Sequence, residues 1–331
     1  MDIDSRVSRE EDIIQIYLRP LAARWPGALE LRDDCAVITP APGQDIIVKT
    51  DPIRAGIHFF TNDNPDDIAW KALATNVSDL AAKAARPFAY TLALSFPRIP
   101  KHDWLSVFAK GLEKAQSAFG CILVGGDTDI ECGPLNISVT MFGEIAKGQM
   151  LKRGRAKPGD SVFVSGTLGD SSLGLHLRKS NNFRNMFSNY ADAALERYLR
   201  PVPRLGLRSA LRGYARASMD ISDGLLKDLQ RMCSVSGVGA SINARELPLS
   251  TAMQHVAKLD FRQAISFIAG SDDYEILCAV PPEDDKNFIA AAHAGCVAVT
   301  KIGEFSSDPV VRLLDDSGAH MNWGMDNLYF L

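Results

Sequence analysis

Short strand-like apolar runs alternate with amphipathic helical segments along this chain, and that alternation limits its possible folds more than any other feature. Residues 10–24 carry apolar side chains at helical spacing. Residues 35–38 and 46–49 are instead short runs rich in β-branched residues, separated by Pro-Ala-Pro-Gly. Segments with apolar residues at helical spacing and short strand-like runs continue to alternate downstream, which predicts an α/β (or α+β) fold.

Turn-forming residues and charges cluster between residues 147 and 160, which makes this segment the best candidate for a domain boundary. Because 331 residues exceed one typical core, we expect an N-terminal domain over residues 1–150 and a C-terminal α/β domain over residues 151–331. In the first we predict helices over 64–85 and 103–119, and strands over 88–96, 121–124 and 135–145. In the second we predict strands over 162–165, 217–221 and 274–280, and helices after 170, between 191 and 211, and over 225–235 and 286–294.

Composition narrows the choice of partner and compartment. A net charge of -4 argues against a surface that holds nucleic acid by neutralising its phosphates. The six cysteines are widely spaced without a Cys-x-x-Cys pair, which is typical of reduced, intracellular thiols. No apolar run approaches about 18 residues, and the N-terminus lacks the pattern of a secretion signal. We therefore expect a cytoplasmic protein with a small-molecule partner, and neither nucleic acid nor membrane.

Acidic residues recur at the edges of apolar runs, and together they predict a metal site. A carboxylate beside packed apolar surface is costly unless it is paired or bound to a cation, and Mg²⁺ prefers such oxygen ligands. A Gly-Gly pair before one of these acids would let the backbone approach a phosphate closely. The pattern therefore predicts magnesium-dependent phosphate chemistry. The acidic signals are Asp33-Asp34, Thr50-Asp51, Ser78-Asp79, Gly126-Asp127, Asp220 and Asp223.

Each of these signals also has a purely structural interpretation. Asn76 and Asp79 share one helical face that solvent alone would satisfy. Gly125-Gly126-Asp127 would suit a hairpin turn, and Ser222-Asp223 would cap the following helix. Residues 166–172 join a strand to a helix. Their amides would bind an anion, or, more commonly, the segment would be only a structural turn. No nucleophile elbow, zinc spacing or cysteine–histidine pair indicates covalent or zinc chemistry.

The order and spacing of these segments resemble the thiamine-monophosphate kinase family, from Asp33 to Gly303. The resemblance implies the two-domain fold shared with aminoimidazole ribonucleotide synthetase and selenophosphate synthetase, in which N-terminal sheets form a barrel across a homodimer. It also implies Mg²⁺-dependent transfer of the ATP γ-phosphoryl group to thiamine monophosphate, giving thiamine diphosphate and ADP. The matching segments are Asp33-Asp34-Cys35-Ala36, Thr50-Asp51, His58-Phe59, residues 76–82, Gly125-Gly126-Asp127-Thr128, residues 153–160, residues 165–170, residues 220–224 and Asp272-Asp273-Tyr274-Glu275.

The same resemblance implies a role for each site residue, with the N-terminal domain binding ATP and magnesium and forming the dimer. Catalysis would involve Asp127, Asp220 and Arg153. The magnesium ligands would be Asp34, Thr50, Asp51, Asp79, Asp127, Asp220 and Asp223. ATP would contact Gly126, Asp127, Arg153 and Ser222, and the thiamine substrate would lie against His58, Asp272 and Met325.

Several positions depart from the family pattern. Lys49 stands where a small residue usually precedes Thr-Asp, and Arg32 precedes the acidic pair where glycine is common. Ser271-Asp272 replaces the usual Gly-Glu, and Met325 lies where an aromatic residue tends to contact the substrate. These departures keep two alternatives open: another ATP-dependent synthetase of the same fold, and a nucleotide-binding sensor without turnover. The selenophosphate reading is disfavoured because no cysteine precedes Cys35, and the sensor reading because a sensor would need fewer metal ligands.

Overall fold

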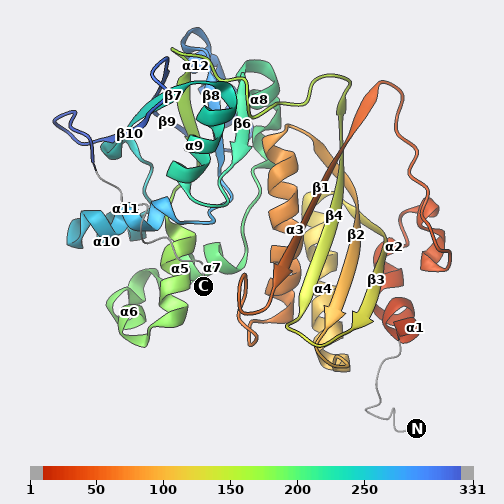
Figure 1. Cartoon of the computed structure of the whole chain (residues 1–331). Coiled ribbons are helices and arrows are strands. Elements are labelled where there is room, and N and C mark those ends of the chain that lie inside the picture. The colour runs from red at the N-terminus through yellow and green to blue at the C-terminus, as the bar shows by residue number, and fades with distance from the viewer. Residues whose placement is uncertain (1–9, 322–331) are drawn as a thin grey trace. The chain divides into compact units, whose positions relative to one another are not determined.

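The computed structural model describes residues 10–321, which form two compact units (Figure 1). The first unit extends to Gly148 and the second begins at Gln149, except that residues 81–85 belong to the second unit. The family resemblance implied a barrel across a dimer, and a single chain does not test that expectation.

The first unit contains a four-stranded sheet in the order β1-β4-β2-β3. Strands β2 and β3 are parallel, and the other neighbours are antiparallel. Strand β1 pairs with β4 along its whole length, from Gln44 opposite Ala146 to Arg54 opposite Asn136. The strands are β1 Gln44–Arg54, β2 Arg86–Phe96, β3 Ile122–Ile130 and β4 Asn136–Ala146; the helices are α1 Glu10–Ile13, η1 Ile14–Leu18, α2 Arg19–Ala22, η2 Pro26–Leu31, α3 Pro65–Ala82 and α4 His102–Phe119.

Helices α3 and α4 cover one face of this sheet and lie behind it in Figure 1. They pack closely at Gly111, where an added Cβ would come within 2.7 Å of the Asp66 backbone. The N-terminal helices lie beside the edge strand β3, and Trp25 stacks on Phe88 of β2 with ring centroids 5.7 Å apart. Alternate residues of β4 are buried, which matches a sheet with one face packed on helices.

Three sequence predictions for the first unit are wrong in detail. Residues 35–38 form no strand, and the Val37 amide donates to the Gly27 carbonyl in a loop contact of 2.7 Å. Thr50 and Asp51 were expected after the end of a strand but lie inside β1, because the pairing of β1 with β4 continues to Arg54. Gly125-Gly126-Asp127 lies inside β3 and closes no hairpin, because β3 pairs in parallel with β2. The helices predicted over 64–85 and 103–119 are confirmed as α3 and α4.

The second unit contains a six-stranded sheet in the order β10-β7-β9-β5-β8-β6. Only the β10–β7 pair is parallel among the pairs described. The strands are β5 Ser161–Ser165, β6 Ala217–Asp220, β7 Gly239–Asn243, β8 Ile276–Val280, β9 Val299–Ser306 and β10 Val311–Leu314. The helices are α5 Asp170–Lys179, α6 Asn181–Met186, η3 Ser188–Tyr190, α7 Ala191–Leu199, η4 Leu205–Leu207, α8 Arg208–Tyr214, α9 Leu225–Ser236, η5 Ala244–Glu246, α10 Thr251–Leu259, α11 Phe261–Ala269, η6 Pro282–Asp284 and α12 Asp285–Ala294.

Helices cover both faces of the second sheet. Every residue of β5 and β8 is buried, as expected for strands that are covered on both sides. Phe163 of β5 contacts Phe288 of α12, with ring centroids 5.1 Å apart, while Val162 and Val164 belong to the apolar cluster shared with α9, α10 and α11. The mixed helices and sheets of both units confirm the α/β (α+β) prediction.

The predicted strand over 274–280 begins two residues later in the structure, at Ile276. Tyr274 has a φ of 54°, in the left-handed region that a strand residue cannot adopt. Strands β7, β9 and β10 and helices α10 and α11 were not predicted from the sequence. The three strands are short, and their pairing depends on the rest of the sheet. The two helices have a clear apolar face that the sequence analysis missed, with Met253 and Val256 buried in α10 and Ile265 and Ile268 buried in α11.

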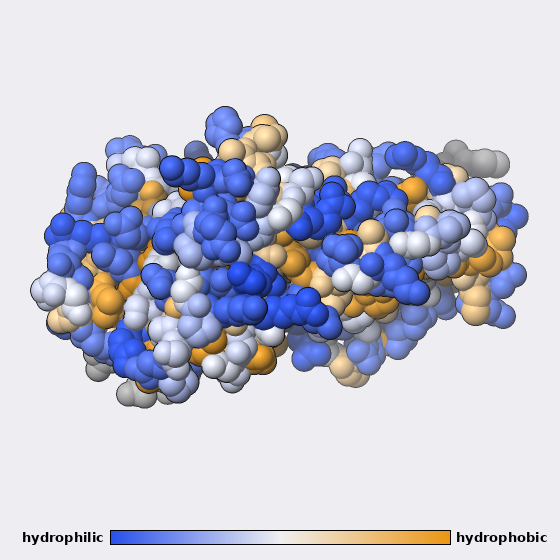
Figure 2. All heavy atoms as spheres, turned by 90° about the horizontal axis from the view of Figure 1, so that it is seen from above, coloured by the Kyte–Doolittle hydropathy of each residue, from blue (hydrophilic) through white to orange (hydrophobic). Residues whose placement is uncertain are grey.

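Large exposed apolar side chains include Val48 and Met186. On the face shown in Figure 2, apolar areas are small and lie between hydrophilic residues. Among residues 10–321 no helix has the length and apolar character needed to cross a membrane.

Gly126 is required by the close approach of β3 to β2. A Cβ at this position would lie 1.9 Å from the Leu92 carbonyl oxygen, whereas a Cβ at Gly125 would meet only Thr91 Cγ2 at 3.8 Å. We therefore expect Gly126→Ala to lower the free energy of unfolding by about 3 kcal/mol, and Gly125→Ala to change it by less than about 1 kcal/mol. Urea unfolding of the two variants checks this, and equal stabilities would show that the strands separate without cost.

Candidate active site

A pocket of about 410 Å³ in the first unit brings together several predicted site residues. One wall is the N-terminal segment, which contributes Glu10, Leu31 and the loop of residues 32–36. The opposite wall is β3, which contributes residues 123–128. Asp34 and Asp127 thus line one pocket together with the Gly125-Gly126 backbone, which is a combination suited to a phosphate and its cation.

Asp127 lies on the exposed part of β3, and its carboxylate has a single hydrogen bond in the described structure. The Thr128 amide donates to Asp127 Oδ1 at 2.9 Å. The pairing of β3 with β2 shifts just before this point, because Tyr90 lies opposite Leu123 and Thr91 opposite Gly125, so Val124 is an extra residue. Such a bulge re-aims the side chains that follow it and is common at functional sites.

A second acidic pair in the first unit consists of Asp51 on β1 and Asp79 on α3. The Lys49 ammonium group lies between them, with Nζ 3.0 Å from Asp51 Oδ2 and 2.9 Å from Asp79 Oδ2. Partial burial lowers the pKa of Lys49, but the Asp79 and Asp51 carboxylates together raise it by more, so the pKa of this ammonium group is raised above its usual value. The pair is therefore bridged by a cation of the protein itself.

Asn76 holds the backbone of Asp51 in place. The Asp51 amide donates to Asn76 Oδ1 at 2.9 Å, and Asn76 Nδ2 donates to the Asp51 carbonyl at 3.4 Å. Asn76 is completely buried, so the alternative that its helical face is solvated is wrong. Thr50 lies on the opposite face of β1, where its hydroxyl is 2.8 Å from the Thr140 hydroxyl. The structure thus separates the Thr50 side chain from Asp51 and Asp79.

His58 lies in the turn that follows β1. Its Nδ1 accepts a hydrogen bond from the Arg54 amide at 3.0 Å, which places the ring proton on Nε2 when the imidazole is neutral. Lys71 of α3 donates to the His58 carbonyl at 3.0 Å. The turn is therefore tied to α3, and the imidazole orientation is set by the backbone.

In the second unit, the antiparallel pairing of β8 with β5 and β6 gathers three segments at one edge of the sheet. The end of β5, the end of β6 and the start of β8 meet there. Asp220, at the end of β6, is buried with 5% of its surface exposed. The next residue is tied to the segment before β8 by two backbone hydrogen bonds. The Ile221 amide donates to the Glu275 carbonyl at 2.8 Å, and the Tyr274 amide donates to the Ile221 carbonyl at 2.9 Å.

The loop after β6 is held by Asp228 from the first turn of α9. Asp228 Oδ2 accepts from the Ser222 and Asp223 amides, both at 2.9 Å, and burial raises the pKa of its carboxyl despite these bonds. The predicted cap is wrong, since Gly224 is the N-cap residue and makes no side-chain capping bond. The Asp223 carboxylate forms ion pairs with Arg231 and, at 3.5 Å, with Lys227. A metal ion at Asp223 would have to share or displace these cations.

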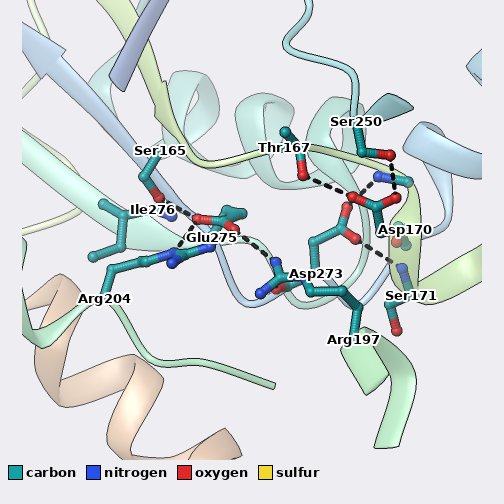
Figure 3. Close-up of polar contacts among 12 residues, drawn as sticks. Ser165, Thr167, Asp170, Ser171, Arg197, Arg204, Ser250, Asp273, Glu275 and Ile276 are labelled. Carbon is teal, nitrogen blue, oxygen red and sulfur yellow. Dashed lines mark hydrogen bonds and ion pairs between the residues drawn. The ribbon is translucent and has the colours of Figure 1, made fainter. Parts of the chain in front are cut away.

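Glu275 is the centre of a buried ion cluster that the sequence analysis did not single out (Figure 3). Its carboxylate is completely buried and accepts from Ser165 Oγ at 2.6 Å, Arg197 Nη2 at 2.7 Å and Arg204 Nε at 2.6 Å. Gly166 leaves room for this carboxylate, because a Cβ there would lie 2.2 Å from Glu275 Oε1. Two arginines that precede it by 78 and 71 residues are thus fixed against one glutamate.

The backbone amides of residues 166–171 are bound by groups of the protein itself, and those of Gly166 and Leu168 donate to the Ala298 and Pro248 carbonyls, both at 3.0 Å. The Gly169 and Ser171 amides donate to Asp273 at 2.6 and 3.1 Å, while Asp170 accepts from the Thr167 and Ser250 hydroxyls at 2.7 and 2.5 Å (Figure 3). The structural-turn interpretation of this segment is therefore the one the contacts favour. Burial raises the pKa of Asp273 to about 7, against the opposing effects of the Gly169 amide and Arg197.

Stability should therefore fall as the pH rises from about 4 to about 7. An unfolded aspartate has a pKa of about 3.9, so in this window the folded chain binds more protons at Asp273 than the unfolded chain does. The slope from this group is up to about 1.4 kcal/mol per pH unit. Urea unfolding at several pH values should show that Asp273→Asn loses this slope while Asp129→Asn, at an exposed position, keeps it. An unchanged slope in Asp273→Asn would show that Asp273 is ionised throughout.

The other predicted residues of the second unit lie near these segments or outside the described residues. Asp272 accepts from Ser171 Oγ at 2.5 Å. Arg153 is half-buried, and its carbonyl accepts from Ser236 Oγ at the end of α9 at 3.4 Å. Met325 lies outside the described residues 10–321. The structure therefore brings Asp220, Ser222, Asp223 and Asp272 to one sheet edge and connects Arg153 to α9.

The donor chemistry fits magnesium. Within the described ranges no three acidic, histidine or cysteine side chains are already grouped to hold a metal ion. Mg²⁺ commonly keeps several waters and takes one or two protein carboxylates plus substrate phosphates, so pairs of carboxylates suffice. The bridge of Lys49 between Asp51 and Asp79 shows that these two carboxylates lie close enough to share one cation, a place that the ammonium group takes in this structure.

Family models match both units. The model of the N-terminal domain of AIR synthase related proteins matches residues 32–145, and the model of the C-terminal domain matches residues 157–316. The chain is therefore an AIR synthase related protein with both of that family's domains.

Individual relatives narrow this class. The thiamine-monophosphate kinase of Caulobacter vibrioides is 42% identical over 299 residues, which cover 89% of this chain and 84% of that protein. The crystal structure of thiamine-monophosphate kinase from Stenotrophomonas maltophilia K279a has a TM-score of 0.79 at 35% identity, covering 88% of this chain and 91% of that one. AaThiL complexed with AMPPCP and TMP has a TM-score of 0.74 at 30% identity, covering 86% and 87%. Within the AIR synthase related proteins, this chain belongs to the thiamine-monophosphate kinase family.

Proposed function

We propose that this chain transfers the γ-phosphoryl group of ATP to the phosphate of thiamine monophosphate, giving thiamine diphosphate and ADP, with Mg²⁺ bound to its carboxylates. The observation that supports it most is the pocket in which Asp34 and Asp127 flank a Gly-Gly backbone, in a chain of the thiamine-monophosphate kinase family. A structure from that family, AaThiL, holds AMPPCP and TMP. Both ligands are phosphate compounds, which agrees with such a pocket.

The residues of the chain would act mainly by binding and alignment. The attacking oxygen belongs to a phosphate that is already ionised, so no strong general base is needed and charge repulsion is the main obstacle. Bound Mg²⁺ would offset this charge and bring the two anions together. The Gly125-Gly126 backbone lines the pocket that would take a phosphate, and the Arg153 guanidinium would add positive charge.

The proposed roles follow the family motifs. Asp127, Asp220 and Arg153 would serve catalysis; the Mg²⁺ ligands would be Asp34, Thr50, Asp51, Asp79, Asp127, Asp220 and Asp223; ATP would contact Gly126, Asp127, Arg153 and Ser222; and thiamine monophosphate would contact His58, Asp272 and Met325. For Thr50 the side chain lies on the opposite face of β1 from Asp51, so a shared metal ion would require the Thr50 backbone oxygen. For Asp223 it requires exchange with Arg231.

We further propose a homodimer that acts in the cytoplasm, where ATP is available. Support for the dimer comes from β1 and β4, whose outward side chains on the face away from α3 and α4 are only partly buried, with Val48 57% exposed. Light scattering of the purified chain tests this, and a monomeric mass would contradict it.

The kinase proposal is tested by incubating the purified chain with thiamine monophosphate, ATP and Mg²⁺ and measuring thiamine diphosphate and ADP. We expect the two products in equal amounts, and none when magnesium is chelated. Nucleotide binding without product would instead support the sensor alternative, in which the departures at Lys49 and Asp272 accompany a silent site.

A further inference from the structure

Lys49 occupies the position between Asp51 and Asp79 that a cation shared by the two carboxylates would take. Lys49 and Asp51 are two residues apart on β1 and therefore share the face that looks toward α3, which carries Asp79. The ammonium nitrogen is about equally far from both carboxylates, at 3.0 and 2.9 Å. The side chains are 30%, 44% and 21% exposed for Lys49, Asp51 and Asp79, so this is a partly desolvated triad.

An ammonium group and a divalent ion exclude each other at this point. The ammonium holds each carboxylate oxygen at about 3 Å, whereas Mg²⁺ needs its oxygen ligands at about 2.0–2.1 Å. A metal ion could bridge the pair only if the ammonium left and the carboxylates closed around the smaller ion. Both cations in the same space would repel each other strongly in a partly desolvated site.

The backbone position of Asp51 is set by Asn76 and not by Lys49. Its backbone amide and carbonyl are both held by Asn76, which is completely buried in α3. Asp79 lies one helical turn further along the same helix as Asn76. Removing the ammonium should therefore leave the backbone of both residues in place, with two carboxylates that Lys49 no longer bridges.

We propose that the Lys49 ammonium group is the resident cation of the Asp51–Asp79 pair and replaces one divalent ion there. The chain then binds one divalent ion fewer than it would with a small residue at position 49. The inference rests on the proposed function only in taking these carboxylates as metal ligands. It assigns Lys49 a positioning role, in which a fixed charge keeps Asp51 and Asp79 together before any substrate arrives.

The test is to count the Mn²⁺ ions bound per chain, with Mn²⁺ in place of Mg²⁺, by electron paramagnetic resonance of the free ion. The titration is made with and without a non-hydrolysable ATP analogue. We expect Lys49→Ser and Lys49→Gln each to bind one Mn²⁺ more than the wild type. Lys49→Arg, which keeps the positive charge, should bind the wild-type number. The extra ion should disappear in the double variant Lys49→Ser with Asp79→Asn.

Lys301→Ser is the matched control, because Lys301 also pairs with one carboxylate, that of Asp285, at 2.9 Å. It should bind the wild-type number of ions. Thermal unfolding gives a second readout: without divalent ions Lys49→Ser should melt below the wild type, and Mn²⁺ should raise its midpoint by more than it raises that of the wild type. Lys49→Gln retains an N–H donor for the carboxylates and serves if the serine variant does not fold.

Equal Mn²⁺ numbers and equal affinities in the wild type, Lys49→Ser and Lys49→Gln would overturn the inference, as would an extra ion that persists after Asp79→Asn. The count is independent of turnover. If the Lys49 variants bind an extra ion but the chain makes no thiamine diphosphate, the inference holds and the proposed reaction is rejected. If the chain makes thiamine diphosphate but the variants bind no extra ion, the reaction holds and the inference is rejected.

Discussion

Replacing Glu275 with glutamine should lower the free energy of unfolding by about 3–5 kcal/mol, which is the typical cost of breaking a buried ion cluster by removing one partner. Glu275 is completely buried, and its carboxylate accepts from Arg197, Arg204 and Ser165. Glutamine has nearly the same volume, so the loss is electrostatic and not a cavity effect. Two partly buried guanidinium groups, with side chains 18% and 21% exposed, would lose the carboxylate that pairs with both, and the glutamine amide would direct its own N–H groups toward these donors.

Urea unfolding measures this loss, and Glu144→Gln is the matched control. Glu144 also pairs with an arginine, Arg86, but its side chain is 23% exposed and that of Arg86 is 55% exposed. Exposed pairs contribute at most about 1 kcal/mol, so the control should remain close to the wild type. Similar losses in the two variants would mean that water or a rearranged arginine compensates the Glu275 site.

The largest effect on activity is expected for Asp127→Asn, which should lower kcat by at least about 100-fold, the order found when one electrostatic contact to the reacting groups is removed. Asp127 lines the pocket that also contains Asp34, and it is exposed to that space. Its only described hydrogen bond is from the Thr128 amide to Oδ1, and an asparagine oxygen accepts that bond equally well. The fold should therefore be unaffected while the negative charge is lost.

Asp129→Asn is an unusually close control for this variant. Asp129 lies two residues further along β3 and accepts from the next amide, that of Ile130, in the same way, but it is not part of the pocket wall. Steady-state kinetics and thermal unfolding of both variants separate the roles. Wild-type kcat in Asp127→Asn, or an equal loss in Asp129→Asn, would remove Asp127 from the mechanism.

Elements defined by local chemistry were predictable from the sequence. The start of α3 is an example, because Asn64 accepts from the Asp66 amide at 3.1 Å and the next residue is a first-turn proline, as the Asn-Pro-Asp-Asp pattern indicates. Elements that depend on distant partners were not predictable. Gly125-Gly126-Asp127 has the composition of a turn, yet pairing with β2 keeps it in a strand.

The same distinction holds for the candidate sites. The acidic residues could be identified because carboxylates at the ends of apolar runs require a cation. Their actual partners could not, because the Lys49 bridge joins β1 to α3 and the Glu275 cluster joins residues about 70–110 positions apart. Asp228 had a weak local signal, an acid in the first turn of a helix, but the two amides it binds become apparent only once the loop has folded back.

The position of β4 has a consequence for the order in which the first unit folds. β4 is the last strand of its sheet in the sequence, yet it lies between β1 and β2, and among the described strands β1 pairs only with β4. During synthesis, β1 must therefore wait for about 80–90 further residues before its neighbour exists, a closure of the kind that slows folding. A nascent chain that ends before residue 136 presents a long unpaired strand to other chains, which is a known route to aggregation.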